Sequence, residues 1–309
     1  MMSLAAITPQ VAQKLQNTLA AERRPAPAAM LTLAPVSVAN DQETPVYSRP
    51  TAPKSIGGVL DDAVNLYREC LPRSWPLALA AQVALALTDI HLQSQLPPHA
   101  LADPQVLFAL LRSGDFLLSA LFSCLLLLLF NYALIDHMHA IATHRPASLG
   151  RSIGVGVRLL PRAILASILV AVATGVGFLL LLVPGIYLAG AWLLTFAAMV
   201  IGDAGVVESM RISQRLIKGH WWRSTTLYSV AALIALAFFT IVGLLLGLSA
   251  PPSPAAGAIV IGLQRLASVA VGSLMMLWFP TVLLSLYYDL DLRRTGADLA
   301  QRVAQLPGR

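Results

Sequence analysis

The chain has 309 residues, of which 57% are hydrophobic and only 12% are charged, and its formal net charge is +6 at pH 7. This composition lies outside the range of soluble globular domains and therefore excludes the soluble classes of protein. The basic residues border long apolar stretches. We therefore expect them to bind the anionic headgroups of a lipid bilayer, and we expect no binding of nucleic acid.

The N-terminal segment, residues 1–54, is rich in Ala and Pro. Such a composition cannot support a hydrophobic core, so we predict a disordered tail. Order is predicted to begin at Ser55, a suitable N-cap, and to continue to residue 300. From residue 56 to residue 70 apolar side chains recur at helical period, which predicts an amphipathic helix lying at a membrane interface. Residues 301–309 form a short C-terminal tail in this interpretation.

Six apolar stretches follow that are each long enough to cross a bilayer. A helix needs about 20 residues, at about 1.5 Å each, to cross about 30 Å of hydrocarbon. The sequence therefore predicts an all-α polytopic membrane protein with six transmembrane helices. We place the spans at about 75–92, 116–135, 163–183, 186–202, 225–250 and 266–288.

The distribution of Lys and Arg predicts the orientation of these spans. All but two of the 21 Lys and Arg residues, Arg112 and Arg265, lie before the first span, in the second-to-third and fourth-to-fifth connections, or after the last span. Positively charged connections stay in the cytoplasm. We therefore expect both termini to be cytoplasmic, in a multi-pass protein of the bacterial inner membrane.

A similar arrangement precedes the first, third and fifth spans. Residues 55–73, 148–162 and 203–223 each predict a short cytoplasmic interfacial helix that ends in basic residues and leads into a span. The pattern favours three parallel repeats of an interfacial helix plus a transmembrane hairpin. The alternative is that basic inner connections are a general feature of polytopic proteins and that no repeat exists.

Two short motifs carry a family resemblance. They are Lys218-Gly-His-Trp-Trp222 and Tyr287-Tyr288-Asp289-Leu290, supported by Val183-Pro-Gly-Ile-Tyr187. Over roughly residues 55–300 the chain resembles the bacterial six-span family of YciC-like inner-membrane proteins, which is related to the membrane domain of some glycerophosphodiester phosphodiesterases. The resemblance implies a polytopic inner-membrane protein. It does not imply hydrolysis, because the hydrolase of those proteins is a separate soluble domain.

Two charged residues fall inside or near the predicted spans. At about 1.5 Å per residue, Asp89 lies about 21 Å and Arg265 about 33 Å from the inner interface. Charges at such depths are costly and tend to pair, so Asp89 and Arg265 are a candidate polar pair. The favoured alternative leaves both unpaired near the outer headgroups. Candidate interhelical hydrogen-bonding residues are Gln82, Asn131 and Gln264.

Further polar candidates lie in the inner connections. We expect no metal and no cofactor, because His137, His139 and His144 sit where a span leaves the membrane and lack a paired ligand cluster, although His137 and His144 would share one helix face. The other group suits contacts with headgroups or with a membrane or cytoplasmic protein partner. It comprises Arg211, Arg215, Lys218, Trp221, Trp222 and Arg223.

No nucleophile elbow, zinc-protease, P-loop or dinucleotide-binding motif occurs in the sequence. The sequence therefore favours a non-catalytic inner-membrane protein with a structural, interaction or envelope-maintenance role. A transporter or lipid-handling protein is the main alternative, and an intramembrane enzyme around Asp136, His137 and His139 is the third. A mid-depth that is almost wholly apolar disfavours ion-coupled transport of polar solutes. The sequence leaves the oligomeric state open.

Overall fold

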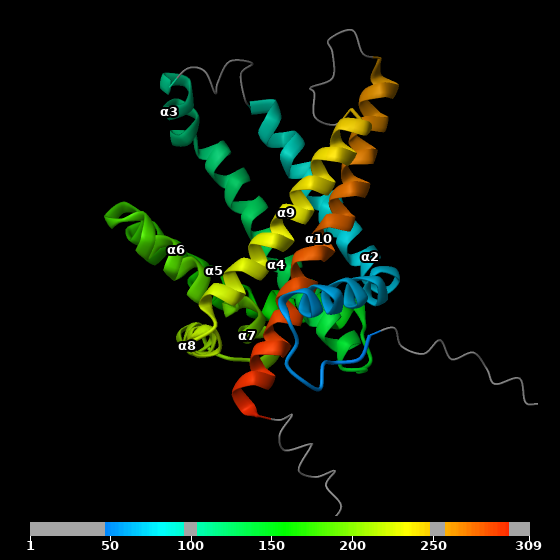
Figure 1. Ribbon diagram of the computed structural model, residues 1–309. Helices are drawn as coiled ribbons and strands as arrows, with labels where there is room; N and C mark the ends of the chain where they lie inside the picture. The colour runs from blue at the N-terminus through cyan, green and yellow to red at the C-terminus, as the bar shows by residue number, and fades with distance from the viewer. Residues whose placement is uncertain (1–46, 96–103, 248–256, 297–309) are drawn as a thin grey trace, which may run out of the picture. The chain divides into compact units, whose positions relative to one another are not determined.

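The computed structural model describes residues 47–95, 104–247 and 257–296, which all belong to one compact unit, residues 45–309. Every regular element in these ranges is an α-helix (Figure 1). The predicted tail up to residue 46 and the predicted C-terminal tail, 301–309, lie outside the described residues. The helices are α2 Ile56–Gln95, α3 Pro104–Arg112, α4 Gly114–Ala142, α5 Leu149–Leu180, α6 Leu182–Ala191, α7 Thr195–Gly202, α8 Val206–Ile217, α9 Trp221–Leu245 and α10 Ala258–Thr295.

Six helical segments of this unit are long and apolar enough to cross a membrane. Each overlaps one of the six predicted spans, so the prediction of an all-α, multi-pass membrane protein is confirmed. The segments begin earlier or end later than predicted, because the helices continue beyond the apolar stretches into their polar flanks. The six segments are Ile56–Gln93, Gly114–Ala142, Leu149–Leu180, Leu182–Gly202, Trp221–Leu245 and Ile259–Thr295.

The predicted interfacial helices are joined to their spans in different ways. In the first predicted repeat the interfacial helix and the span form one helix, α2, which contains Pro72 and Pro76. In the second predicted repeat they also form one helix, α5, which contains Pro161. Figure 1 shows that α2 changes direction sharply along its length, as expected where proline removes a backbone hydrogen bond. In the third unit α8 and α9 are separate, and Gly219 between them has a φ of +88°.

The fourth span is broken into α6 and α7, which the sequence did not predict. Residues 192–194 leave the helical path, and a non-helical backbone at membrane depth must find partners within the protein. Ser213 of α8 supplies them: its hydroxyl accepts from the Leu194 amide (3.1 Å) and donates to the Ala191 carbonyl (2.8 Å). Ser213 and Leu194 are both fully buried, so α8 packs directly over the break.

The buried core lies at one end of the unit, which we call the basic end. It is the end at which α2, α5 and α9 begin and α4 and α10 finish. The buried part of α4 runs from Tyr132 to Ala142, and that of α10 includes Leu277, Leu284 and Leu290. The two longest helices, α2 and α10, form the most extensive helix pair. The basic end is therefore where helices that are distant in sequence are held together.

Towards the opposite end the helices diverge (Figure 1). Apolar side chains there are largely uncovered by protein, including Leu118 of α4, Leu244 of α9 and Ile259 of α10. At the tight connection between α5 and α6 a Cβ added to Gly177 would lie 3.0 Å from the Gly185 Cα, so the two helices approach backbone to backbone. The exposed apolar side chains of this end suit contact with lipid chains.

The predicted disordered tail, residues 1–54, extends too far, because residues 47–54 are packed on the protein. They were expected to be disordered, yet the Tyr47 and Pro50 side chains are buried and the Tyr47 amide donates to Glu69 Oε2 (3.2 Å). The reason is that polar groups of several helices converge on this segment, which composition alone does not reveal. The segment thus packs on the basic end before α2 begins.

Candidate functional site

The most densely bonded polar group of the basic end is Asp289, near the end of α10. Its residue is 1% exposed, and its carboxylate forms ion pairs with Arg223 (3.0 Å) and Arg293 (2.9 Å). It also accepts a hydrogen bond from the backbone amide of Lys54 (2.9 Å). A buried carboxylate requires this degree of compensation, because an unpaired charge is very costly away from water.

The same arginines hold the segment that precedes α2. Arg223 and Arg293 both donate to the carbonyl oxygen of Lys54, at 2.5 and 2.7 Å. The Lys54 ammonium in turn binds Asp62 of α2 (2.6 Å). These five residues, Lys54, Asp62, Arg223, Asp289 and Arg293, are called the Asp289 network below. The network joins residues 47–55, α2, α9 and α10 at one point.

A second polar contact lies beside the Asp289 network. The Tyr288 hydroxyl is 2.6 Å from His139 Nδ1 of α4, and both residues are buried. The guanidinium of Arg49 lies 4.4 Å from the centre of the Tyr288 ring, within the range of a cation–π interaction. Burial raises the pKa of the nearby Tyr47 hydroxyl above its ordinary value of 10.0. The Tyr-Tyr-Asp-Leu motif therefore contacts α4 and the 47–55 segment together.

The three candidate histidines are not brought together. His137 Nδ1 lies 3.3 Å from the hydroxyl of Ser152, which donates to Asp136, whereas His139 binds Tyr288. The expected shared helix face of His137 and His144 is wrong, because α4 ends at Ala142 and His144 is exposed with a φ of 52°. Within the described ranges no three His, Cys, Asp or Glu residues lie close enough to hold a metal ion.

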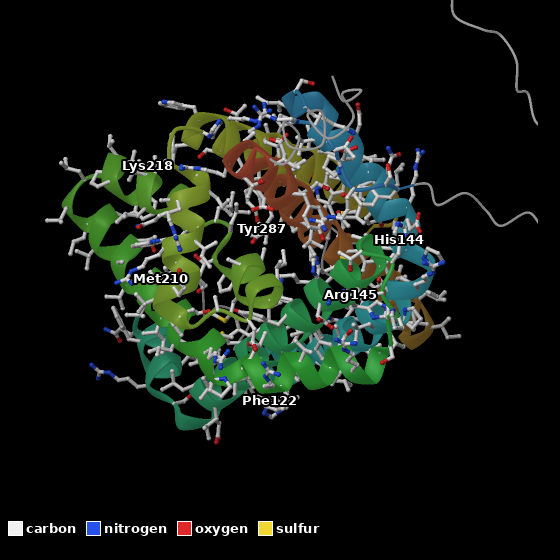
Figure 2. All side chains as sticks on the ribbon, turned by 90° about the horizontal axis from the view of Figure 1, so that it is seen from below. Phe122, His144, Arg145, Met210, Lys218 and Tyr287 are labelled. Carbon is white, nitrogen blue, oxygen red and sulfur yellow. The ribbon has the colours of Figure 1, made fainter. Side chains whose placement is uncertain are left out.

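The candidate residues on α8 and at the start of α9 have separate roles. Arg211 and Arg215 reach Glu208 along the exposed face of α8, beside a surface hollow of about 480 Å³. Trp221 stacks on Tyr187 of α6 and donates to its carbonyl (3.1 Å), whereas Trp222 is 79% exposed. Seen from the basic end, Lys218 and Arg145 lie on opposite sides of Tyr287 (Figure 2).

Lys218 and Arg223 make further contacts that hold the helices of the basic end together. The Lys218 carbonyl accepts a hydrogen bond from Arg294 at the end of α10 (2.6 Å). Arg223, a candidate for contact with a headgroup or a partner, belongs to the Asp289 network. The exposed candidates that remain for a partner or a headgroup are therefore Arg211, Arg215, Lys218 and Trp222.

At the opposite end the structure places Arg265 of α10 beside Asp89 of α2, with 3.7 Å between Arg265 Nη1 and Asp89 Oδ2. Gln93 joins the two: its side-chain oxygen accepts from Arg265 (2.7 Å) and its amide donates to Asp89 (2.6 Å). A groove of about 530 Å³ between α2 and α10 reaches these side chains. Gln93 was not a sequence candidate, although it lies one helical turn from Asp89.

The three uncharged polar candidates lie on three different helices. Gln82 lies against Gly272 of α10, where an added Cβ would come within 2.6 Å of its amide nitrogen. Gln264 donates to the carbonyl of Gly247, just beyond α9. Asn131 is half-buried on α4, and nothing in the described part of the chain forms a hydrogen bond with its side chain.

Asp203 is a polar residue that the sequence did not single out. It ends α7 in the left-handed conformation, with a φ of 44°, and its carboxylate binds Arg158 and Arg162 of α5. Hydrogen bonding to Arg158 is the first cause that holds the pKa of Asp203 below its ordinary value. An Asp directly after a predicted helix could have indicated such a cap, because Asp tolerates this backbone conformation.

No family model matches the chain, and no solved structure matches it. A UPF0259 membrane protein of Sodalis glossinidius (strain morsitans) is 36% identical over 83 residues, which cover 27% of this chain and 33% of that protein. The match thus spans about a third of the length of this curated relative. Together with the six apolar helices, this shows a multi-pass integral membrane protein that is similar to a bacterial UPF0259 membrane protein.

Proposed function

We propose that this protein is a non-catalytic scaffold of the bacterial inner membrane, with both termini and the basic end in the cytoplasm. The orientation rests on the positive-inside rule, because nearly all Lys and Arg residues lie at the basic end or in the segments attached to it. The role is interaction: the basic end forms a fixed base on which a membrane or cytoplasmic partner docks.

The observation that carries this proposal is the Asp289 network. Its charges are paired with one another, and Asp289 is fully enclosed. A carboxylate enclosed in this way stabilises an arrangement of segments and presents no open face to a substrate. The network therefore supports a structural base and not a reaction centre.

The exposed face of α8 supports an interaction role for that base. Arg211 and Arg215 keep about two thirds of their side-chain surface exposed, at 68% and 65%. The opposite face of α8 is buried at Ser209 and Ser213, and Ser213 bonds it to the break between α6 and α7. A rigidly mounted helix with an exposed basic face suits an acidic protein surface or anionic headgroups.

Lipid handling is the second candidate function. The observation that favours it is the lateral groove between α2 and α10, which reaches a polar pair at one end and is otherwise lined mainly by apolar side chains. A groove of this kind suits an amphipathic molecule and not a small polar solute.

Cysteine labelling tests the orientation. In a Cys124→Ser background, Thr51→Cys reports on the basic end and Asp115→Cys on the opposite end, since both positions are exposed. We expect a membrane-impermeant maleimide to label Asp115→Cys in intact cells and Thr51→Cys only after permeabilisation. The reverse pattern would overturn the assigned orientation.

A native pull-down in mild detergent with protein and lipid analysis tests the interaction role. We compare the wild type with Arg211→Ala/Arg215→Ala and with the control Arg68→Ala, which removes an exposed arginine of α2. The proposal predicts that the α8 variant loses a protein or anionic lipid that the wild type and the control retain. Identical recovery from all three proteins would contradict docking on α8.

A further inference from the structure

The polar group at the opposite end combines a cation and an anion on neighbouring helices. Arg265 of α10 and Asp89 of α2 lie 3.7 Å apart, which is longer than a direct hydrogen bond, and Gln93 connects them. Their side chains are 46% and 55% exposed, so both present a free surface to the groove side. Each charge is held in place by the Gln93 amide and not enclosed by it.

Both charged groups retain bonding capacity. A guanidinium has five N–H donors and an ionised carboxylate has about four acceptor sites. Within the described residues Arg265 uses one donor on Gln93, and Asp89 accepts one bond from Gln93. A ligand that carries an anion and an ammonium group close together would complement both residues at once.

An apolar groove extends from this polar group towards the basic end. Gln82 and Gly272 lie at its far limit, each seven residues from the charge on its own helix, which corresponds to about 10 Å of groove length. Between the two levels the wall is formed by apolar side chains, among them Val83, Ala86 and Val269, with Phe239 contributed by α9. The Gln82 side chain lies directly against Gly272 and marks this end of the groove.

We propose that this groove is a binding site for a phospholipid with an ethanolamine headgroup. The phosphate contacts Arg265, the primary ammonium contacts Asp89, and one acyl chain lies along the apolar wall between α2 and α10. The site has the polarity of such a lipid, with its charges at one end and hydrocarbon contacts along the rest. A choline headgroup has no N–H group and so cannot donate a hydrogen bond to Asp89. A glycerol headgroup has no positive charge for Asp89 to bind.

The test is titration of the purified full-length protein with matched-chain phosphatidylethanolamine, phosphatidylcholine and phosphatidylglycerol, followed by native mass spectrometry. A charge-assisted hydrogen bond predicts that the ethanolamine lipid binds about tenfold more tightly than the choline lipid. Asp89→Asn should remove this preference, because it should weaken ethanolamine-lipid binding far more than choline-lipid binding. Arg265→Gln should weaken both lipids about tenfold.

Two further variants separate headgroup from chain contacts. Ser268→Phe fills the groove and should weaken all three lipids, whereas Arg112→Gln removes an exposed arginine of α3 and should change nothing. If Ser268→Phe fails to fold, the nearly isosteric Asp89→Asn variant still tests whether the headgroup binds at Asp89. Equal binding of the three lipids by the wild type, or an ethanolamine preference that survives Asp89→Asn, would overturn the proposal. None of these outcomes depends on docking at α8.

Discussion

The two ends of this membrane protein differ in how their helices are held together. At the basic end, α2, α4, α9, α10 and residues 47–55 are joined by buried polar contacts, and most of the fully buried side chains lie there. At the opposite end the helices diverge and expose apolar side chains, and the polar contacts there are half-exposed. Both ends are rich in Leu, Val and Ile, so hydrophobicity does not account for the difference.

The difference between the two ends indicates which interactions hold helices together in a bilayer. Lipid chains are as apolar as leucine, so an apolar surface gives one helix no strong reason to leave lipid for another. Close packing then depends on small residues and on polar groups that find partners between helices. The basic end has such groups in Asp289, Tyr288 and Ser213, and the opposite end has mainly the contacts of Arg265. Variants of the two ends should therefore differ in their effect on stability.

The largest effect is expected from Asp289→Asn. The change leaves Arg223 and Arg293 side by side without their counter-charge, and breaking a buried ion pair in this way costs about 3 kcal/mol. Thermal unfolding in detergent measures the loss, and trypsin cleavage after Lys54 should accelerate because the two arginines that bind the Lys54 carbonyl lose the carboxylate that positions them. Asp291→Asn, two residues further along α10, is the matched control. Equal melting temperatures of the two variants would refute the central role of Asp289.

A smaller loss is expected from Ser213→Ala. The Leu194 amide and the Ala191 carbonyl would both lose their partner inside the protein, at a cost of about 2 kcal/mol. Ser209→Ala is the control, because Ser209 is equally buried on α8 but bonds only to Val206 of its own helix. The comparison is made by thermal unfolding. If both serine variants melt together, α8 does not stabilise the break between α6 and α7.

Smaller effects are expected at the opposite end. Asp89→Ala and Arg265→Ala should each lower the stability in detergent by less than about 1 kcal/mol, because both side chains are half-exposed. The double variant should lose less than the sum of the single losses, since either change already removes their contact. Strict additivity would show that the two residues are not coupled. A loss as large as that of Asp289→Asn would remove the distinction between the two ends.

The smallest effect is expected from Asp203→Asn, which keeps a residue that tolerates the left-handed conformation but removes the charge facing Arg158 and Arg162. Because the pKa of Asp203 is lowered from its ordinary value of 3.8, the ionised form stabilises the folded protein above that value. This contribution is lost as the pH falls through the lowered pKa. Melting temperatures of wild type and variant should therefore differ slightly at neutral pH and converge in acid. A difference that persists in strong acid would assign it to something other than the charge.

The sequence predicted the features that depend on local patterns. Six spans follow from length and hydropathy, and the basic connections follow from composition. The break after Ala191 could not be predicted, because the Ser213 hydroxyl that binds its backbone groups lies on another helix. Likewise, Tyr288 and Asp289 were visible as a motif, but their partners His139, Lys54 and Arg223 are distant in sequence and only the fold brings them together.

The sequence offered Asp89 and Arg265 as a candidate pair but favoured the arrangement in which both are unpaired, for a similar reason. Measuring depth from Trp75 and from Tyr287 separated the two charges by about 12 Å at 1.5 Å per residue. In the structure the Trp75 indole donates to Ser273, which lies well before Tyr287 along α10. Trp75 and Tyr287 are therefore not at the same depth, and the register of α2 against α10 brings Asp89 to within 3.7 Å of Arg265.

The most direct test of the account is a spin-label distance measurement at both ends of the molecule in lipid nanodiscs. One pair of labels is placed at the exposed positions Thr51 and Arg151 of the basic end, and the other at Asp115 and Ile259 of the opposite end. We expect a narrow distance distribution at the basic end and a broad one at the opposite end, because few contacts restrain the helices there. Equally narrow distributions, or a broader one at the basic end, would contradict it.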